Sequence, residues 1–199
     1  MRVLFQLLFF LSISFFKGQD LNKLANLSSK IENEREIRIY VDNGITNSGK
    51  IFRIYQENNN KWNAEVIQWF LPEKISEDEF EMIPAKVNKL KSKDILEKAF
   101  VNIEAMNIGH LPKEENFNYK TSKSKAVYDD ENGYVLLTRE ISITDGVGFS
   151  VKYKSNKKEN EFHYSNPKSY LKDTPGIDEY ESFMKILKYV ENNFNIQLD

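Results

Sequence analysis

Residues 36–70, EIRIYVDNGITNSGKIFRIYQENNNKWNAEVIQWF, decide the fold of this 199-residue chain. Over 36–44 apolar side chains alternate with polar or aromatic ones, which is the period of a half-buried strand. Residues 50–70 predict two further strands around the three asparagines at 58–60, because asparagine tolerates the left-handed conformations of tight turns. Three strands joined by short connections predict an antiparallel meander.

A second group of strands is predicted in the C-terminal half. The Asn-Gly pair at 132–133 is the strongest hairpin signal in the chain, with strands on both sides and a long one over 134–143. Alternating aromatic and apolar residues over 149–153 predict another strand. The polar turn 155–160 then leads into a last strand at 161–164, EFHY.

Three helices are predicted from apolar residues spaced three and four apart. Residues 20–33 predict a short amphipathic helix, and Ser92 is expected to cap a second helix with its apolar face over 96–103. The clearest helix covers 178–194, and its first turn resembles a capping box. Residues 166–176, NPKSYLKDTPG, contain two prolines and predict a surface loop.

These elements predict an α+β fold. We expect one antiparallel sheet of about six to seven strands, in two meander or hairpin groups, with the three helices packed on one face. The segment 20–199 is long enough to bury one sizeable core, so it is expected to form a single domain.

The first 19 residues, MRVLFQLLFFLSISFFKGQ, predict an exported protein. Arg2 precedes the apolar run 3–16, which is shorter than the roughly 20 residues that a membrane-spanning helix needs. We therefore expect 1–19 to be a signal peptide that is cleaved between Ser14 and Asp20. After cleavage no stable membrane anchor is expected, and the protein would lie in the periplasm or outside the cell. An uncleaved anchor is the alternative.

Composition narrows the functional classes. The chain has no cysteine, which excludes disulfides, thiol catalysis and thiolate metal sites, and an exported chain without disulfides is more typical of bacteria. Abundant asparagine, lysine and isoleucine also suggest an AT-rich bacterial genome. Without 1–19 the formal charge is −4, since 26 basic residues face 30 acidic ones. Such a domain is a poor nucleic-acid binder, because phosphate contacts dominate that affinity.

Cofactor and metal motifs are missing from the sequence. There is no phosphate-binding GxxxxGK[ST] loop, no HExxH zinc helix and no GxSxG nucleophile elbow. No cofactor is therefore predicted. The acidic stretch 73–81 contains carboxylates that suit a cation such as calcium, but its spacing is that of an ordinary solvated loop, so no metal site is assigned.

Two histidines are the only imidazoles available for acid–base chemistry. His163 alternates with two aromatic residues, which places it on the same strand face as Glu161; the pair would either orient an imidazole for catalysis or form a polar pair on a solvated face. His110 follows the middle helix, where Gly109 is expected to serve as the C-cap, and it would interact with the helix C-terminus. No catalytic residue is assigned, and His163, Glu161 and His110 are the catalytic candidates.

Strand aromatics are the other candidates for a site. Trp62 and Trp69 lie seven residues apart on one strand, so they are expected on opposite faces of the sheet. With Tyr40 and Tyr55, an uncovered face would offer an aromatic platform for a sugar, a peptide or a partner protein. The alternative is that helices cover the rings and that they are core residues.

The sequence favours an exported, non-catalytic binding or protein-interaction module with a protein or glycan partner. One alternative is an envelope or secreted hydrolase that uses carboxylates and a histidine, and such an enzyme would hold a histidine and two acids in one concave pocket. A second alternative is an exported inhibitor or immunity-type protein that occludes another protein's active site.

Overall fold

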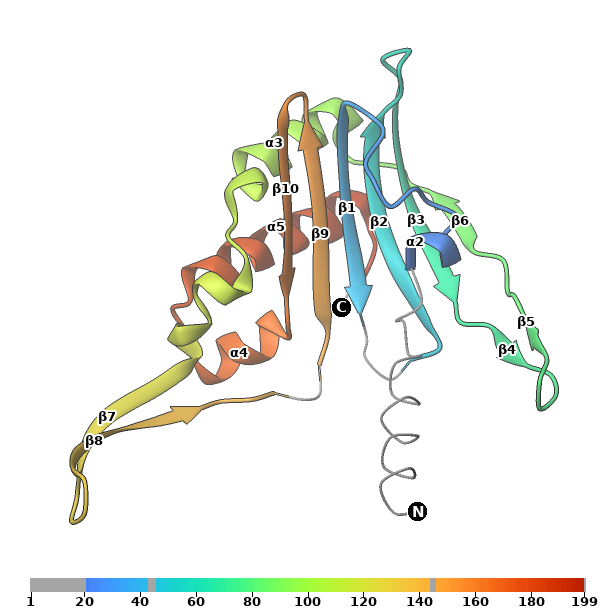
Figure 1. The fold of residues 1–199 in the computed structure, drawn as a ribbon. Helices are drawn as coiled ribbons and strands as arrows, with labels where there is room; N and C mark the ends of the chain where they lie inside the picture. The colour runs from blue at the N-terminus through green and yellow to red at the C-terminus, as the bar shows by residue number, and fades with distance from the viewer. Residues whose placement is uncertain (1–20, 43–45, 144–145, 199) are drawn as a thin grey trace.

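The computed structural model describes residues 21–42, 46–143 and 146–198 and has an α+β fold (Figure 1). The expected signal peptide, 1–19, lies outside the described residues. One antiparallel sheet has the strand order β10-β9-β1-β2-β3-β6. Its strands are β1 (Arg35–Asp42), β2 (Ser48–Gln56), β3 (Trp62–Phe70), β6 (Lys86–Lys89), β9 (Gly148–Ser155) and β10 (Lys158–Tyr164).

The other described elements surround this sheet. The helices are α2 (Leu21–Leu24), α3 (Leu96–Ala105), α4 (Pro167–Asp173) and α5 (Asp178–Phe194), with the short 3-10 helices η2 (Ile108–His110), η3 (Glu114–Asn116) and η4 (Asn118–Thr121). Two small sheets are formed by β4 (Glu73–Lys74) with β5 (Phe80–Glu81), and by β7 (Ser122–Asp129) with β8 (Gly133–Glu140).

The meander predicted from residues 36–70 is confirmed. β1 pairs with β2 and β2 with β3, all antiparallel, so that Ile37 lies opposite Ile54 and Ile54 opposite Ala64. β1 also pairs with β9, which joins the two strand groups into one sheet. Tight turns in this fold use asparagine in the left-handed region. The non-glycine residues described with positive φ are Asn26, Asn60, Asn107, Asn156, Asn166 and Asn195.

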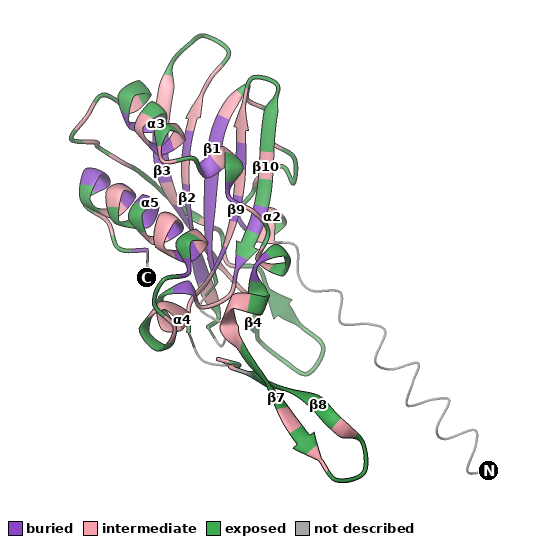
Figure 2. Cartoon of the chain, turned by 90° about the vertical axis from the view of Figure 1, so that its left-hand side faces the viewer, coloured by how far each residue is buried: buried purple, intermediate pink, exposed green. Residues whose placement is uncertain are grey.

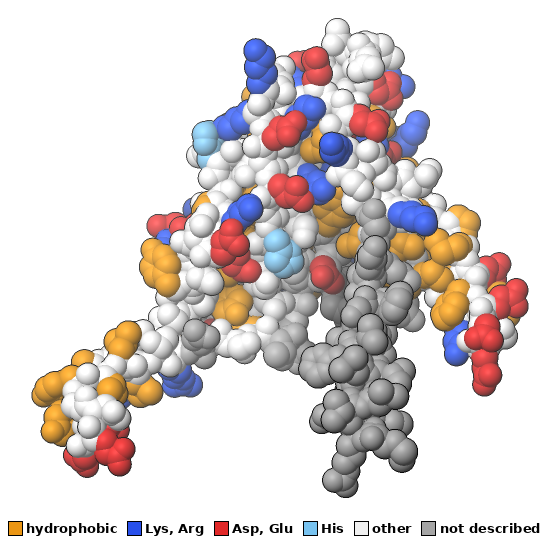
Figure 3. All heavy atoms as spheres, in the orientation of Figure 1, with side chains coloured by type: hydrophobic (Ala, Val, Ile, Leu, Met, Phe, Trp, Pro, Cys, Tyr) orange, Lys and Arg blue, Asp and Glu red, His pale blue; other side chains and the backbone are white. Residues whose placement is uncertain are grey.

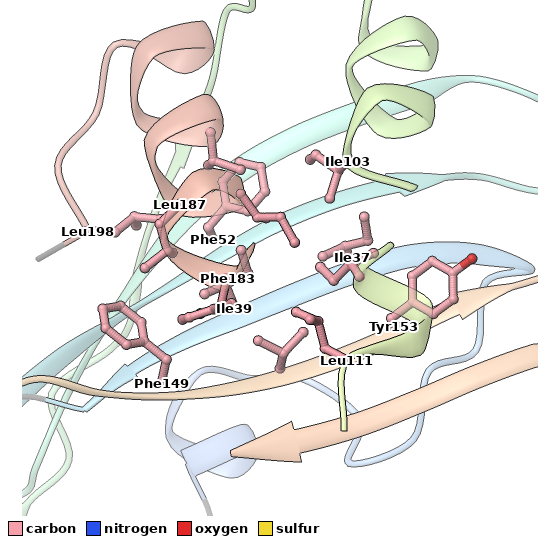
Figure 4. Packing of buried hydrophobic residues seen from close by; sticks show 14 of the residues in the cluster. Ile37, Ile39, Phe52, Ile103, Leu111, Phe149, Tyr153, Phe183, Leu187 and Leu198 are labelled. Atoms are coloured by element: carbon pink, nitrogen blue, oxygen red, sulfur yellow. The ribbon is translucent and has the colours of Figure 1, made fainter. Parts of the chain in front are cut away.

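The main core lies between one face of the sheet and helices α3 and α5 (Figures 1 and 4). Ile37, Ile39 and Phe52 point from the strands towards Ile103 of α3 and Leu187 of α5, and all five are buried. Alternation along each strand produces this face, because every second side chain points to the same side. In Figure 2, β1 is accordingly coloured as buried along most of its length, whereas β2 and β3 combine buried and intermediate residues.

The opposite face of the sheet carries a second, smaller core and a buried charge network. Tyr40, Ile51 and Trp69 pack there against Leu24 of α2. Trp69 lies directly across from Gly49, where an added Cβ would come within 2.4 Å of the indole ring. This glycine is therefore needed for the close approach of the ring to the neighbouring strand.

Glu36 is the centre of the charge network and is completely buried. It accepts hydrogen bonds from Arg38 Nε and from Arg53 Nε, the latter at 2.7 Å, and Arg53 also reaches Glu65 at 3.0 Å. Arg38 further donates to the backbone carbonyl of Ser28. The network thus ties the segment that follows α2 to the face of the sheet.

Several predicted elements are corrected by the structure. The predicted helix at 20–33 is only the single turn α2, because Asn26 takes a left-handed conformation, and it packs on the face opposite α3 and α5. The predicted loop at 166–176 contains α4, since Pro167 is at the start of the helix, where proline is favourable. Within the predicted connection 71–91, β6 forms an edge strand paired with β3.

The predicted caps are also wrong. Helix α3 begins after Ile95 without a side-chain cap, and Ser92 instead accepts a hydrogen bond from Asn193 at 2.7 Å. The proposed capping box of α5 is not formed, because Asp178 is already the first helical residue and no side chain caps the helix. α3 ends well before Gly109.

The predicted hairpin around 132–133 is confirmed, but it is not part of the main sheet. Among the described strands, β7 and β8 pair only with each other, and they extend away from the body of the protein (Figures 1 and 2). The main sheet therefore has six strands, and the second predicted strand group contributes only β9 and β10 to it.

Candidate functional site

A cavity of about 880 Å³ lies along the outer strand β10. Its wall is formed by β9 and β10, by the segment that contains η3 and η4, and by tyrosines of α4 and α5. Hydroxyl and charged side chains dominate the lining, including those of Ser150, His163, Ser165, Glu114 and Glu161. Most ligand sites have a more apolar lining, but the polar side chains that converge here can offer several hydrogen bonds to a ligand.

The β9–β10 hairpin fixes the register of this site. Its two-residue turn, with Asn156 in the left-handed region, places Ser155 opposite Lys158. Counting along both strands from this turn, Ser150 lies opposite His163. Opposite residues in an antiparallel pair project from the same face, so the serine hydroxyl and the imidazole meet.

His163 is held between two serines, and one of them is tied to a carboxylate. Its Nδ1 lies 2.9 Å from Ser150 Oγ, and its Nε2 lies 3.2 Å from Ser165 Oγ. Ser165 Oγ donates its proton to Glu114 Oε2 at 3.0 Å. Because that proton is used, Ser165 accepts from Nε2–H, and Nδ1 is left to accept the Ser150 hydroxyl. In the neutral imidazole, this chain of hydrogen bonds therefore places the proton of His163 on Nε2.

Glu114 is fixed by several donors. Besides Ser165 Oγ, it accepts hydrogen bonds from the Ser165 backbone N–H at 2.8 Å and from the Tyr180 hydroxyl. Burial, together with the hydrogen bond to Glu114 and its charge, raises the pKa of Tyr180, so the phenol remains a donor. The carboxylate is consequently held in one position at the end of the histidine network.

The catalytic candidates from the sequence are only partly brought together. His163 and Glu161 both line the cavity, but Glu161 is paired with Lys152 at 3.4 Å rather than with the histidine. His110 ends η2, where it contacts Lys158, and it is not among the residues that line this cavity. Both histidine side chains are visible at the surface in Figure 3.

Sequence reasoning missed three members of the network: Ser150, Ser165 and Glu114. Ser150 can be inferred from the sequence once the short turn of the β9–β10 hairpin is known, since this turn determines which residue faces His163. Glu114 lies far from His163 in the sequence and reaches the network only because η3 packs beside the end of β10. No local pattern in the sequence indicates that contact.

The aromatic candidates do not form one surface. Trp62 lies on the face covered by α3, with its ring centroid 5.0 Å from that of Phe100. Trp69 and Tyr40 are on the opposite face, as alternation predicted, but both are buried in the second core. Tyr55 is half-buried, with the Arg53 guanidinium 3.8 Å from the centre of its ring.

The acidic stretch 73–81 forms the exposed β4–β5 hairpin and its turn. Within the described residues, no group of three or more histidine or acidic side chains is arranged to hold a metal ion. The described segments likewise include no helix that is both long and apolar enough to cross a membrane.

The β7–β8 hairpin is a second candidate surface. Tyr134 and Leu136 are 81% and 74% exposed, and Tyr128 packs edge-on against Tyr134. Val135 and Leu137, also exposed, point to the other face of the same hairpin. Figure 3 shows these apolar side chains on a projecting arm whose tip is acidic.

Comparison with known proteins gives no match to this chain among protein-family models, curated proteins or solved structures.

Proposed function

We propose that this protein is an exported, non-catalytic protein-interaction module that docks through the β7–β8 hairpin. The observation that carries the proposal is the exposure of large apolar side chains on both faces of a hairpin that extends from the body. Contiguous exposed apolar surface usually marks an interaction site. Export rests on the apolar N-terminal sequence alone.

A partner would stabilise the hairpin and would pair with its free strand edges. An isolated two-stranded hairpin is only marginally stable in water, and an unpaired strand edge is a template for pairing with another chain. In the part of the chain that the structure describes, β7 and β8 pair with no strand except each other. If the hairpin folded back on the body of the protein, only one of its two apolar faces would be buried. A partner protein can contact both faces.

Site-specific photo-cross-linking in the producing cells tests this function. A photoreactive amino acid at Leu136 is expected to give a discrete cross-linked adduct, because this side chain would lie against the partner. The matched control is the same amino acid at Ile95, which is 72% exposed on the body of the protein. Equal labelling at both positions, or no adduct at Leu136, would contradict the proposal. An exported inhibitor bound to an enzyme would be revealed by the identity of the adduct.

A second candidate function is a hydrolase that acts at the cavity. The supporting observation is the hydrogen-bonded chain Ser150–His163–Ser165–Glu114, in which the imidazole is positioned to take the Ser150 proton. In an acyl transfer, Ser150 Oγ would bond to an ester carbonyl carbon while its proton passes to Nδ1. The leaving alcohol would then take that proton, and water would release the acyl group.

Covalent labelling with a fluorophosphonate reagent distinguishes the hydrolase from the non-catalytic module. If Ser150 is activated, the reagent is expected to label this serine, and both Ser150→Ala and His163→Gln should abolish the labelling. Ser124→Ala is the control, because the Ser124 hydroxyl is exposed and bonds only to Thr138 at 2.9 Å. Peptide mass spectrometry reads the result, and an unlabelled Ser150 in the folded protein would exclude the serine mechanism.

A further inference from the structure

We infer that the partner of the β7–β8 hairpin is a second copy of this chain, bound through β8 about a two-fold axis. This inference rests on the proposed interaction function and names its partner. Three properties of the hairpin carry it: the distribution of charge along its length, the apolar side chains between the charged ends, and the unpaired edge of β8.

The two ends of the hairpin carry opposite charges. The turn holds the consecutive acids Asp129, Asp130 and Glu131. At the other end, Lys123 lies directly opposite Arg139 in the strand register, and with Lys125 these bases outnumber the one acid of that end, Glu140. Like charges directly opposite one another destabilise an antiparallel pair.

In the described part of the chain, no ion pair balances the charges at the basic end. Among the side chains that the structure describes, neither Lys123 nor Arg139 takes part in an ion pair. Asp129 is occupied by hydrogen bonds from the backbone of the turn and from the Asn132 amide, which leaves Asp130 and Glu131 exposed. Both ends therefore favour a partner that brings the opposite charge.

A second hairpin in the antiparallel direction has the required complementarity. If two β8 strands pair about an axis at Leu136, Arg139 of each copy faces Gly133 of the other, next to the acidic turn. The basic end of each copy then meets the acidic end of its partner, and the arrangement closes as a symmetric dimer. A parallel pairing would instead bring like charges together at both ends.

Edge-to-edge pairing also accounts for the two apolar faces. The two hairpins would form a four-stranded sheet in which cross-strand neighbours meet on both faces at once. Leu136 would pack beside its symmetry mate on one face, and Val135 beside Leu137 on the other. Face-to-face packing of two hairpins would cover only one of these faces.

Charge distribution also argues against a lipid surface as the partner. The apolar side chains of β8 lie behind the acidic turn, so insertion of the hairpin would carry three carboxylates into the bilayer first. Charged side chains in the hydrocarbon region are costly.

Complementary charge-reversal variants of the whole chain test the inference by sedimentation velocity. Purified wild-type protein is expected to sediment as a dimer, and Leu136→Asp as a monomer. Lys123→Glu/Arg139→Glu has two acidic ends, and Asp130→Lys/Glu131→Lys has two basic ends, so each should self-associate at least about tenfold more weakly. An equimolar mixture of these two variants should restore the dimer, because each acidic end then meets a basic end. Ile95→Asp, on the body, is the control and should remain dimeric.

The outcomes separate this inference from the function on which it rests. If the mixture of the two charge-reversal variants forms dimers again, the result supports a two-fold hairpin interface. A monomeric wild type, or oligomers that grow without limit as concentration rises, would overturn it. If the protein is monomeric but Leu136 cross-links to a different protein in cells, the second copy is wrong and the interaction function stands. If Leu136 also gives no adduct, both fail. Circular dichroism confirms that each variant is folded.

Discussion

Glu36→Gln is expected to lower the free energy of unfolding by about 3–5 kcal/mol, which is the usual cost of removing one partner of a buried ion pair. Glu36 is completely buried between Arg38 and Arg53, and the amide would leave both guanidinium groups without their central carboxylate. Because Arg38 also holds the backbone after α2, the loss should loosen that segment as well. Urea unfolding followed by circular dichroism measures the change.

A control for this effect is Glu159→Gln. Glu159 pairs with Lys154 at 3.4 Å, but its side chain is 69% exposed. An exposed pair contributes at most about 1 kcal/mol, so this variant should unfold close to the wild type. Equal stabilities of the two variants would show that the buried network contributes no more than a surface pair.

The same network predicts how stability depends on pH. Burial acts to raise the pKa of Glu36, but the hydrogen bonds and charges of Arg53 and Arg38 outweigh it, and the pKa is lowered. A lowered pKa in the folded state adds stability above the pKa of the unfolded chain. This stability is lost as the pH falls through the folded value. Glu36→Gln should therefore flatten the loss of stability of the wild type on acidification.

Phe117→Ala is the second large expected effect, with a loss of about 3–5 kcal/mol for a buried phenylalanine. The Phe117 ring is 2% exposed and makes edge-on contacts with Tyr164 at 5.3 Å and Tyr180 at 5.1 Å between centroids. These contacts hold the segment of η3 and η4 against β10 and α5. The same segment forms one wall of the cavity and leads into β7.

Two measurements test the effect of Phe117→Ala on stability. Urea unfolding gives the global loss, and hydrogen exchange of residues 113–121 should rise more than exchange in β1, because the anchor of this segment is removed. Tyr119→Ala is the matched control, since its ring is 66% exposed. A uniform rise in exchange across the sheet would argue against a local anchoring role for Phe117.

Local patterns in the sequence were sufficient to predict five of the six strands of the main sheet. Alternation predicted β1, β9 and β10, because half-buried strands repeat every two residues, and the asparagine turn at 58–60 predicted β2 and β3 on its two sides. The edge strand β6 escaped this reasoning, since Lys86–Lys89 is exposed and mostly polar. The two prolines of 166–176 predict a loop, but Pro167 lies at the first position of helix α4, where no hydrogen-bond donor is needed.

Long-range placement could not be predicted in the same way. Whether the β7–β8 hairpin joins the main sheet depends on which strand edges of that sheet are free. The sequence of the hairpin does not indicate this, because it resembles the sequence of any exposed hairpin. The network at His163 likewise requires η3 to pack beside β10, which brings Glu114 to Ser165 over 51 positions in the chain. In contrast, the opposite faces of Trp62 and Trp69 follow from strand geometry alone.

The left-handed asparagines also explain part of the amino-acid composition. Six asparagines of the described chain occupy a conformation that glycine adopts most easily, yet an asparagine has fewer conformations to lose when the chain folds. These turns are therefore made at a lower entropic cost than glycine turns would allow. The abundance of asparagine, which suggests a base-composition bias when the sequence is read alone, therefore also serves the backbone at these positions, in the hairpin turns of Asn60 and Asn156 and at the helix ends of Asn166 and Asn195.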